Sequence, residues 1–150
     1  MTSNALIGIA GVHFVASELS RRGMIALPTV RNTVAYDIVA LNVEGTRHAN
    51  IQVKASSKKV SFFPMPHVSK VRDGRYDYYV LVRWLKNESR DDCFLLTGRE
   101  ARKAVRRASA YQAVSIRNGT LKKIYPCIYV SKRNEREMAR WRRAWERWAL

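Results

Sequence analysis

The hydropathy pattern of the first third of the chain changes its period once, and this change limits the folds that the chain can adopt. Before Gly23, four apolar residues share the i, i+3, i+4, i+7 spacing of one helix face: Val12, Val15, Ala16 and Leu19. This spacing predicts a helix over 4–23, with Gly23 as its C-terminal cap. Three short strand-like segments follow, at 24–27, 36–41 and 49–55. Because a turn at Glu44 and Gly45 joins the last two, the order predicts an α/β domain with neighbouring strands.

The rest of the chain alternates between loop, strand and helix patterns. A basic segment with two prolines, 56–70, reads as a loop, and 86–91 reads as a turn. Strands are predicted at 76–84, 92–96 and 124–130. A helix over 98–111 starts with Thr97 and Glu100 as a capping box, and Asn134 is expected to cap a last helix over 134–148.

The last predicted helix carries an apolar stripe opposite several arginines. The residues of the stripe recur at three and four positions: Met138, Trp141, Trp145 and Trp148. Such a stripe belongs to the core or forms a seam between copies of the chain, and it is less suited to base stacking. The spacing alone leaves both alternatives, core and seam, open.

A chain of 150 residues is long enough for a single hydrophobic core, so residues 1–150 are expected to form one domain. The mean hydropathy of −0.33 and the lack of a long apolar run predict no membrane span. Cys93 and Cys127 have no partner at zinc-ligand spacing and are expected to be free, buried thiols. With no signal peptide pattern at the N-terminus, we expect a cytoplasmic protein.

The net charge of +16 points to a polyanionic partner, and it is unevenly distributed. Residues 1–50 carry four basic and three acidic groups (+1), residues 51–100 ten and six (+4), and residues 101–150 fourteen and three (+11). Phosphate contact is the preferred interpretation, and a merely solvated surface is the alternative. The candidate DNA-binding residues are Lys58, Lys59, Lys70, Arg72, Arg75, Arg102 and Arg106.

A carboxylate and a Gln-x-Lys sequence on neighbouring strands form the candidate chemical site. Asp37 lies in the strand 36–41, and Gln52, Val53 and Lys54 lie in the next. The strand period of two places Gln52 and Lys54 on one face. A carboxylate beside amide or carbonyl oxygens offers hard ligands for Mg²⁺, and a lysine nearby can neutralise charge during phosphodiester hydrolysis. On spacing alone, Asp37 can also be a turn-capping acid and Lys54 a surface lysine.

Three segments around these residues resemble the PD-(D/E)XK nuclease superfamily. They are VASELSRRG at 15–23, YDIVA at 36–40 and IQVKAS at 51–56. The resemblance is specific over about residues 8–56 and extends only loosely to the aromatic strand at 76–84. It is closest to small variants with Gln in the third motif position, which include a bacterial group I intron homing endonuclease and restriction-like enzymes. The resemblance implies an αβββαβ core with a mixed central sheet flanked by helices, to which this chain adds a basic C-terminal helix.

The same resemblance implies cleavage of duplex DNA with Mg²⁺ or Mn²⁺. It assigns Asp37 as a catalytic metal ligand, Gln52 in place of the usual acid, the Val53 backbone as a further metal contact, and Lys54 as the catalytic lysine. One metal site cuts one strand, so double-strand cleavage implies a homo-oligomer, a dimer or a tetramer. The seam alternative for the tryptophan stripe fits this expectation.

The chain departs from the family pattern in its first helix. Relatives place a metal-holding Glu where Val12 stands here, and Glu18 lies on a different helix face. This departure leaves two alternatives to an active nuclease. One is a DNA-binding module that keeps the nuclease fold without cutting, and the other is a basic RNA- or ribosome-associated protein, which is favoured by charge alone.

Overall fold

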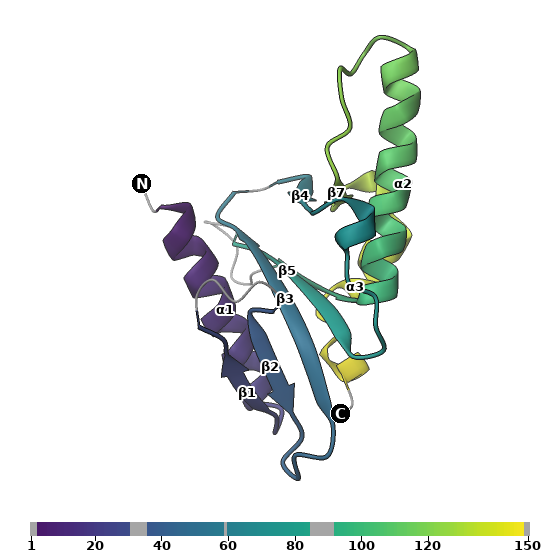
Figure 1. Cartoon of the computed structure of the whole chain (residues 1–150). Coiled ribbons are helices and arrows are strands. Elements are labelled where there is room, and N and C mark those ends of the chain that lie inside the picture. Colours follow the sequence, from purple (N-terminus) through teal and green to yellow (C-terminus); the bar gives the residue numbers. More distant parts are fainter. Residues whose placement is uncertain (1–2, 31–35, 59, 85–91, 149–150) are drawn as a thin grey trace.

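In the computed structural model, residues 3–30, 36–58, 60–84 and 92–148 are described, and they form a mixed sheet with helices on both faces (Figure 1). The strands of the large sheet are β1 (Ile25–Pro28), β2 (Ile38–Leu41), β3 (His48–Ser56), β5 (Asp77–Arg83) and β6 (Asp92–Thr97), in the spatial order β1-β2-β3-β5-β6. Neighbours are antiparallel except β3 and β5, which are parallel. The predicted α/β class with a mixed sheet flanked by helices is confirmed.

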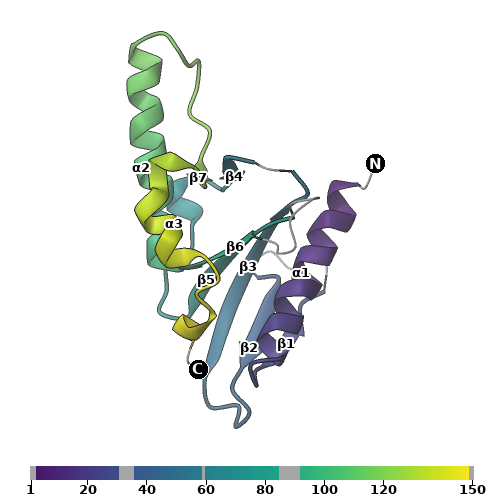
Figure 2. The same ribbon diagram turned by 180° about the vertical axis from the view of Figure 1, so that it is seen from behind.

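Helix α1 (Asn4–Ser20) covers one face of this sheet, as the view from behind shows (Figure 2). Its buried residues recur at every fourth position: Ile7, Gly11, Val15 and Leu19. Gly11 allows the helix to approach β3 closely, because an added Cβ would lie 2.6 Å from the Cβ of Ala55. The chain leaves the helix through Gly23, whose φ of 80° is the left-handed conformation that favours glycine. The helix itself ends at Ser20 with Arg21 as its C-cap, so the predicted end and cap at Gly23 are wrong, and Gly23 instead belongs to the turn that leads into β1.

Helix α2 (Gly98–Arg117) covers the opposite face, over β5 and β6. Its apolar side is built from small residues that pack on the sheet: Ala101, Ala104, Val105 and Ala108. The capping box of Thr97 and Glu100 is present as predicted. The helix continues past Tyr111, its predicted end, to Arg117, and Asn118 and Gly119 (φ 73°) then end it.

The segment predicted as a loop, 56–70, contains regular structure that local sequence does not reveal. It includes β4 (Phe62–Pro64) and the 3₁₀ turn η1 (Val68–Lys70). Strand β4 pairs antiparallel with β7 (Cys127–Tyr129), a partner far along the chain. Because this pairing is non-local, the strand pattern of the segment was not recognised. The predicted turn at 86–91 lies outside the described residues.

The prediction of one continuous helix over 134–148 is wrong. A 3₁₀ turn η2 (Lys132–Asn134) leads into α3 (Glu135–Trp141), and a second turn η3 (Trp145–Trp148) follows after a break. At the break Arg142 forms a β-bridge with Phe94, and the N–H of Arg143 donates to Cys93 O at 2.9 Å. Arg143 has φ of 49°.

The break allows the C-terminal segment to pass round the β6 edge of the sheet. Trp141 is buried in the core under α2, whereas Trp145 and Trp148 are buried in the core under α1. A continuous helix would keep side chains four residues apart on one face and could not supply both cores. The tryptophan stripe is therefore core, and the alternative of a seam formed by these indoles is wrong.

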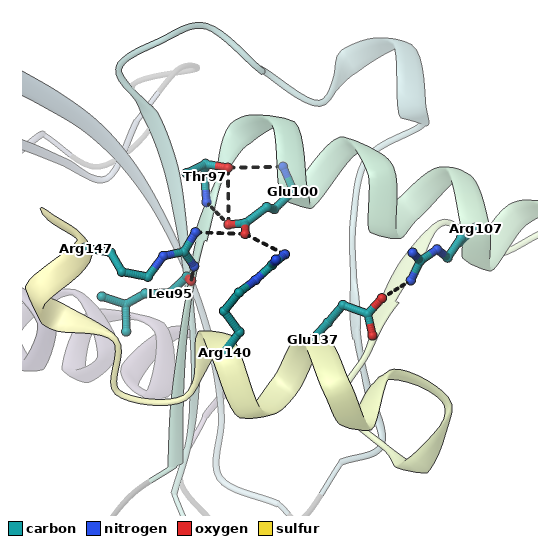
Figure 3. A network of polar contacts seen from close by, with 7 residues as sticks. All are labelled: Leu95, Thr97, Glu100, Arg107, Glu137, Arg140 and Arg147. Carbon is teal, nitrogen blue, oxygen red and sulfur yellow. Dashed lines mark hydrogen bonds and ion pairs between the residues drawn. The ribbon is translucent and has the colours of Figure 1, made fainter.

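The C-terminal segment is fastened to α2 by a carboxylate network (Figure 3). One oxygen of Glu100 accepts from the Thr97 N–H at 2.9 Å and completes the capping box. The other accepts from Arg147 at 2.8 Å and pairs with Arg140 at 3.0 Å. Burial acts to raise the pKa of Glu100, but the hydrogen bond from Arg147 and the neighbouring positive charges outweigh it, so the pKa lies below its ordinary value. A second ion pair joins Arg107 to Glu137.

Two further expectations from the sequence bear on the fold. Cys93 and Cys127 are free and buried, as predicted, and burial raises the pKa of the Cys93 thiol to about 12. Among the described residues, the helices are too short or too polar to cross a membrane.

Candidate functional site

Asp37 lies immediately before β2 and is held there by its own backbone. Its N–H donates to Ile51 O at 2.9 Å, and its C=O accepts from the Thr29 N–H at 2.9 Å. The carboxylate turns toward β3, where Oδ2 accepts from Gln52 Nε2 at 2.5 Å and from the Val53 N–H at 2.7 Å. The structure thus brings together three of the residues that the sequence singled out.

These contacts form where β3 extends beyond the end of its pairing with β2. The pairing of β2 with β3 ends at Ile38 and Ile51, but β3 continues to Ser56. The Val53 N–H therefore has no strand partner on this side, and the Asp37 carboxylate takes that place. The N–H and C=O of one residue in an extended strand project to the same edge, so the Val53 carbonyl faces this open edge as well.

The oxygen atoms gathered at this edge fit a small, hard cation. Within the described chain, no side chain or N–H is recorded as donating to Asp37 Oδ1 or Gln52 Oε1. Together with the Val53 carbonyl they form a set of oxygen donors with one negative charge. Mg²⁺ binds through one or two carboxylates and keeps several waters, so this set is compatible with it. No group of three or more His, Cys, Asp and Glu that could hold a metal is found among the described residues.

Lys54 lies next to this edge on β3. It is two positions from Gln52 and shares its face, and it stands opposite Leu81 of β5. The side chain is half-buried, and none of the ion pairs recorded among the described residues involves it. Its ammonium group is therefore not neutralised by a described carboxylate.

Gln52 and Lys54 face away from α1. Alternate residues of β3, including Ile51 and Val53, are buried in the core under α1, so the intervening residues lie on the other face. On that face α2 lies over β5 and β6, and Figure 1 shows no helix over the described part of β2 and β3. This side of β3 is therefore the accessible side of the candidate site.

A tyrosine and an arginine that the sequence did not connect extend the site. The guanidinium of Arg72 donates to the Tyr36 hydroxyl at 2.9 Å and lies 4.9 Å from the centre of its ring. The N–H of Arg72 donates to the hydroxyl of Tyr79, which stands opposite Gln52 in the β3–β5 register. Burial raises the pKa of Tyr79, so its hydroxyl stays protonated. Arg72 was predicted as a DNA-binding residue, but Tyr36 was missed.

A second carboxylate on the neighbouring strand has contacts similar to those of Asp37. Asp77 opens β5, and its oxygens accept from Asn50 Nδ2 at 3.3 Å and from the Gly74 N–H at 2.9 Å. Like Asp37, it therefore binds one amide side chain of β3 and one backbone N–H. It lies where β3 and β5 are already paired, whereas Asp37 lies at the open edge.

The predicted DNA-binding residues fall into two groups. Five are exposed: Lys58, Lys70, Arg72, Arg75 and Arg106. Arg102 is half-buried, donates to Val71 O at 2.7 Å and pairs with Asp73 at 2.9 Å, so it fastens the segment after η1 to α2. Its guanidinium is therefore already bound within the protein. Lys59 lies outside the described residues.

Helix α1 supplies no carboxylate at Val12, where the resemblance noted in the sequence implies one. Val12 is half-buried and packs against the core under α1. Glu18, the only acidic residue of the helix, pairs with Arg22 at 2.8 Å and with Arg21 at 3.6 Å. In the folded protein, therefore, no carboxylate of α1 takes the place of the glutamate that is absent at position 12.

No protein-family model matches this chain, and no curated protein matches it. Among solved structures, the chain is similar to a bacterial homing endonuclease, I-Ssp6803I, with a TM-score of 0.56 and 17% sequence identity. The similarity covers 97% of this chain and 91% of the other. At this identity the likeness shows that the two chains share a fold.

Proposed function

We propose that this protein is a Mg²⁺-dependent endonuclease that cuts duplex DNA. The observation that carries the proposal is the meeting of Asp37, Gln52 and Val53 at the open edge of β3, one step from Lys54. The shared fold with a homing endonuclease supports it, as does the resemblance of three sequence segments to the PD-(D/E)XK superfamily. Mn²⁺ is expected to replace Mg²⁺.

The residues of the site have separate roles in this proposal. Asp37 Oδ1, Gln52 Oε1 and the Val53 carbonyl hold the metal, which when bound supplies Lewis-acid activation of water and neutralises phosphate charge. Lys54 places a positive charge on the same face and stabilises the negative charge that develops on the phosphate. The hydrogen bond from Gln52 to Asp37 fixes the direction of the carboxylate.

DNA binding in this proposal rests on the exposed basic residues and on Arg72 beside Tyr36. Phosphate contacts position a duplex without reading its sequence, so they define the class of substrate and not the target. Cutting both strands requires two sites, and we therefore propose a dimer or a tetramer. Because the tryptophans are core, the contact between copies must use another surface.

One plasmid assay tests the proposal. Pure protein is incubated with supercoiled DNA in Mg²⁺ or Mn²⁺, and parallel samples contain EDTA. We expect nicked or linear product only with metal, and loss of cutting in Asp37→Asn and Lys54→Met with DNA affinity within a few-fold of the parent. Asp77→Asn is the matched control, because it changes a carboxylate with similar contacts away from the open edge and should retain cutting.

Metal binding is measured separately from cutting. Thermal melts with and without Mg²⁺ should show stabilisation of the parent and of Asp77→Asn, but not of Asp37→Asn. Cutting by Asp37→Asn at the parental rate would show that the metal site is wrongly assigned.

The second candidate, a DNA-binding module without nuclease activity, is favoured by the valine at position 12. It predicts tight duplex binding with no product at any metal concentration. Tighter binding of structured RNA than of duplex DNA would instead support the RNA-associated alternative.

A further inference from the structure

A pocket lined by aromatic side chains lies far from the open edge of β3 in sequence and is not used by the proposed chemistry. The second half of α2 and the return segment 118–126 extend beyond the sheet as an arm (Figure 1). The pocket has a volume of about 480 Å³ and lies between this arm and β4. Its main apolar walls are Phe62, Met65, Tyr111, Leu121, Tyr125 and Tyr129. We call it the aromatic pocket.

Gln112 holds the walls of the aromatic pocket in place. This side chain is only 4% exposed, and its Oε1 accepts from the Tyr125 N–H at 2.6 Å. Its Nε2 donates to Tyr125 O at 2.9 Å and to the Tyr129 hydroxyl at 3.3 Å. This buried amide joins the return segment and the Tyr129 hydroxyl to α2, so this wall of the pocket is formed before any ligand binds, which lowers the entropy cost of binding.

The rings of the aromatic pocket remain partly open to solvent. Phe62 and Tyr111 are each 45% exposed, and Tyr125 is 51% exposed. Exposed aromatic rings grouped round a hollow are unusual on a surface with no partner, and they mark a site of interaction. A flat, unsaturated ring system is the chemistry that such faces accept best.

The charge round the aromatic pocket selects an anionic ligand. None of its lining residues, all of them described, is acidic. Cations stand over its rings, with Lys123 Nζ 5.0 Å from the centre of Tyr125 and the Arg133 guanidinium 3.8 Å from the centre of Tyr111. A second copy of the chain would bring the same positive charge to the contact, whereas a nucleotide brings both a ring and a phosphate.

We propose that the aromatic pocket binds one unpaired nucleotide of the nucleic acid, with its base stacked on Tyr125 and Phe62 and its phosphate near Lys123. Stacking on aromatic faces tolerates any base and occurs only when the base is out of the duplex. The pocket volume lies within the range of about 300–1,000 Å³ that is usual for small-ligand sites. The inference rests on the proposed function, and it adds that DNA with an unpaired or displaced nucleotide is the preferred substrate.

Binding of two short duplexes tests this inference. One carries a single unpaired fluorescent purine analogue, and the other has the same sequence context fully paired. Affinities are measured in EDTA, so that no cutting is needed. We expect the parent to prefer the unpaired duplex and to quench its fluorescence, and we expect Tyr125→Ala to weaken that complex about tenfold while changing the paired one less than about twofold.

Tyr76→Ala is the matched control. Tyr76 is another exposed tyrosine with a cation over its ring, Arg75 at 5.5 Å, but it lies outside the aromatic pocket. This variant should keep the preference for the unpaired duplex. Phe62→Leu, which keeps an apolar side chain and removes only the ring, should reduce the quenching.

Three results would overturn the inference: equal affinity of the parent for both duplexes, an equal loss on both in Tyr125→Ala, or a change in oligomeric state of Tyr125→Ala in sedimentation. The last would show that a second copy occupies the pocket. A failure of the proposed function is distinguishable, because it removes cutting in Mg²⁺ and leaves these binding differences intact.

Discussion

Neutralising Glu100 should loosen the C-terminal segment without breaking the cap of α2. In Glu100→Gln the amide oxygen can still accept from the Thr97 N–H, but the negative charge that binds Arg147 and Arg140 is lost. The side chains of Glu100 and Arg147 are 15% and 28% exposed, so we assign their hydrogen bond about 1.5–3 kcal/mol. Arg140 is 62% exposed and adds about 0–1 kcal/mol.

The free energy of unfolding of Glu100→Gln should therefore fall by about 1.5–4 kcal/mol, mostly through Arg147. For a chain of this length, such a loss lowers the melting temperature by about 3–16 °C. Denaturant titrations of a double-mutant cycle measure the contributions directly. We expect a coupling energy of about 1.5–3 kcal/mol between Glu100→Gln and Arg147→Gln, and of about 0–1 kcal/mol between Glu100→Gln and Arg140→Gln.

The pH dependence gives a second measurement of the same network. Because the folded-state pKa of Glu100 lies below the ordinary value of 4.5, its contribution to stability is complete above that pH and is lost as the pH falls through the folded-state pKa. The difference between parent and Glu100→Gln should be constant from pH 7 to pH 5 and shrink at lower pH. A coupling energy to Arg147 near zero, or a difference that stays constant in acid, would refute the reasoning.

Three further predictions concern α1 and the charged surface. Gly11→Ala should cost about 1–3 kcal/mol in denaturant titrations, because its Cβ meets Ala55, whereas Gly8→Ala, with open space at its Cβ, should not destabilise. If α1 lies close enough to the metal site for a carboxylate at position 12 to reach it, Val12→Glu should increase the stabilisation by Mg²⁺ in thermal melts. A destabilisation that does not depend on metal would contradict that placement of α1. DNA affinity should fall about 10³–10⁵-fold between about 50 and 200 mM salt. Arg106→Ala should reduce the slope of log affinity against log salt concentration by about one, and a parental slope near zero would show that the basic surface does not bind phosphate.

The sequence was most informative where structure is local. The helical spacing before Gly23 and the short segments after it predicted α1, β1, β2 and β3, because each period is set by the residues themselves and short connections leave few ways to pair the strands. The same locality predicted that Asp37 would meet Gln52. Alternation along one strand was enough to place Lys54 on the face of Gln52.

The contacts of individual residues at the site could not be predicted from the sequence and are known only from the folded chain. Tyr36 and Arg72 are far apart in sequence and meet only in the folded chain, where Tyr36 precedes β2 and Arg72 precedes β5. The contacts of Arg102 with Val71 and Asp73 are also non-local. On charge alone, the sequence predicted Arg102 to be available for DNA binding. Charge in a sequence does not show which guanidinium groups the fold has already used.

The sequence by itself determined the α/β class, the first helix, the strands of the large sheet and the residues that gather round Asp37, since these follow from local period and short-range pairing. Only the tertiary structure decided the break after Trp141, the pairing of β4 with β7 and the aromatic pocket. The spacing of the tryptophans favoured one helix. The chain instead passes round a sheet edge, because burying indoles in two cores outweighs the helical hydrogen bonds lost at Arg143.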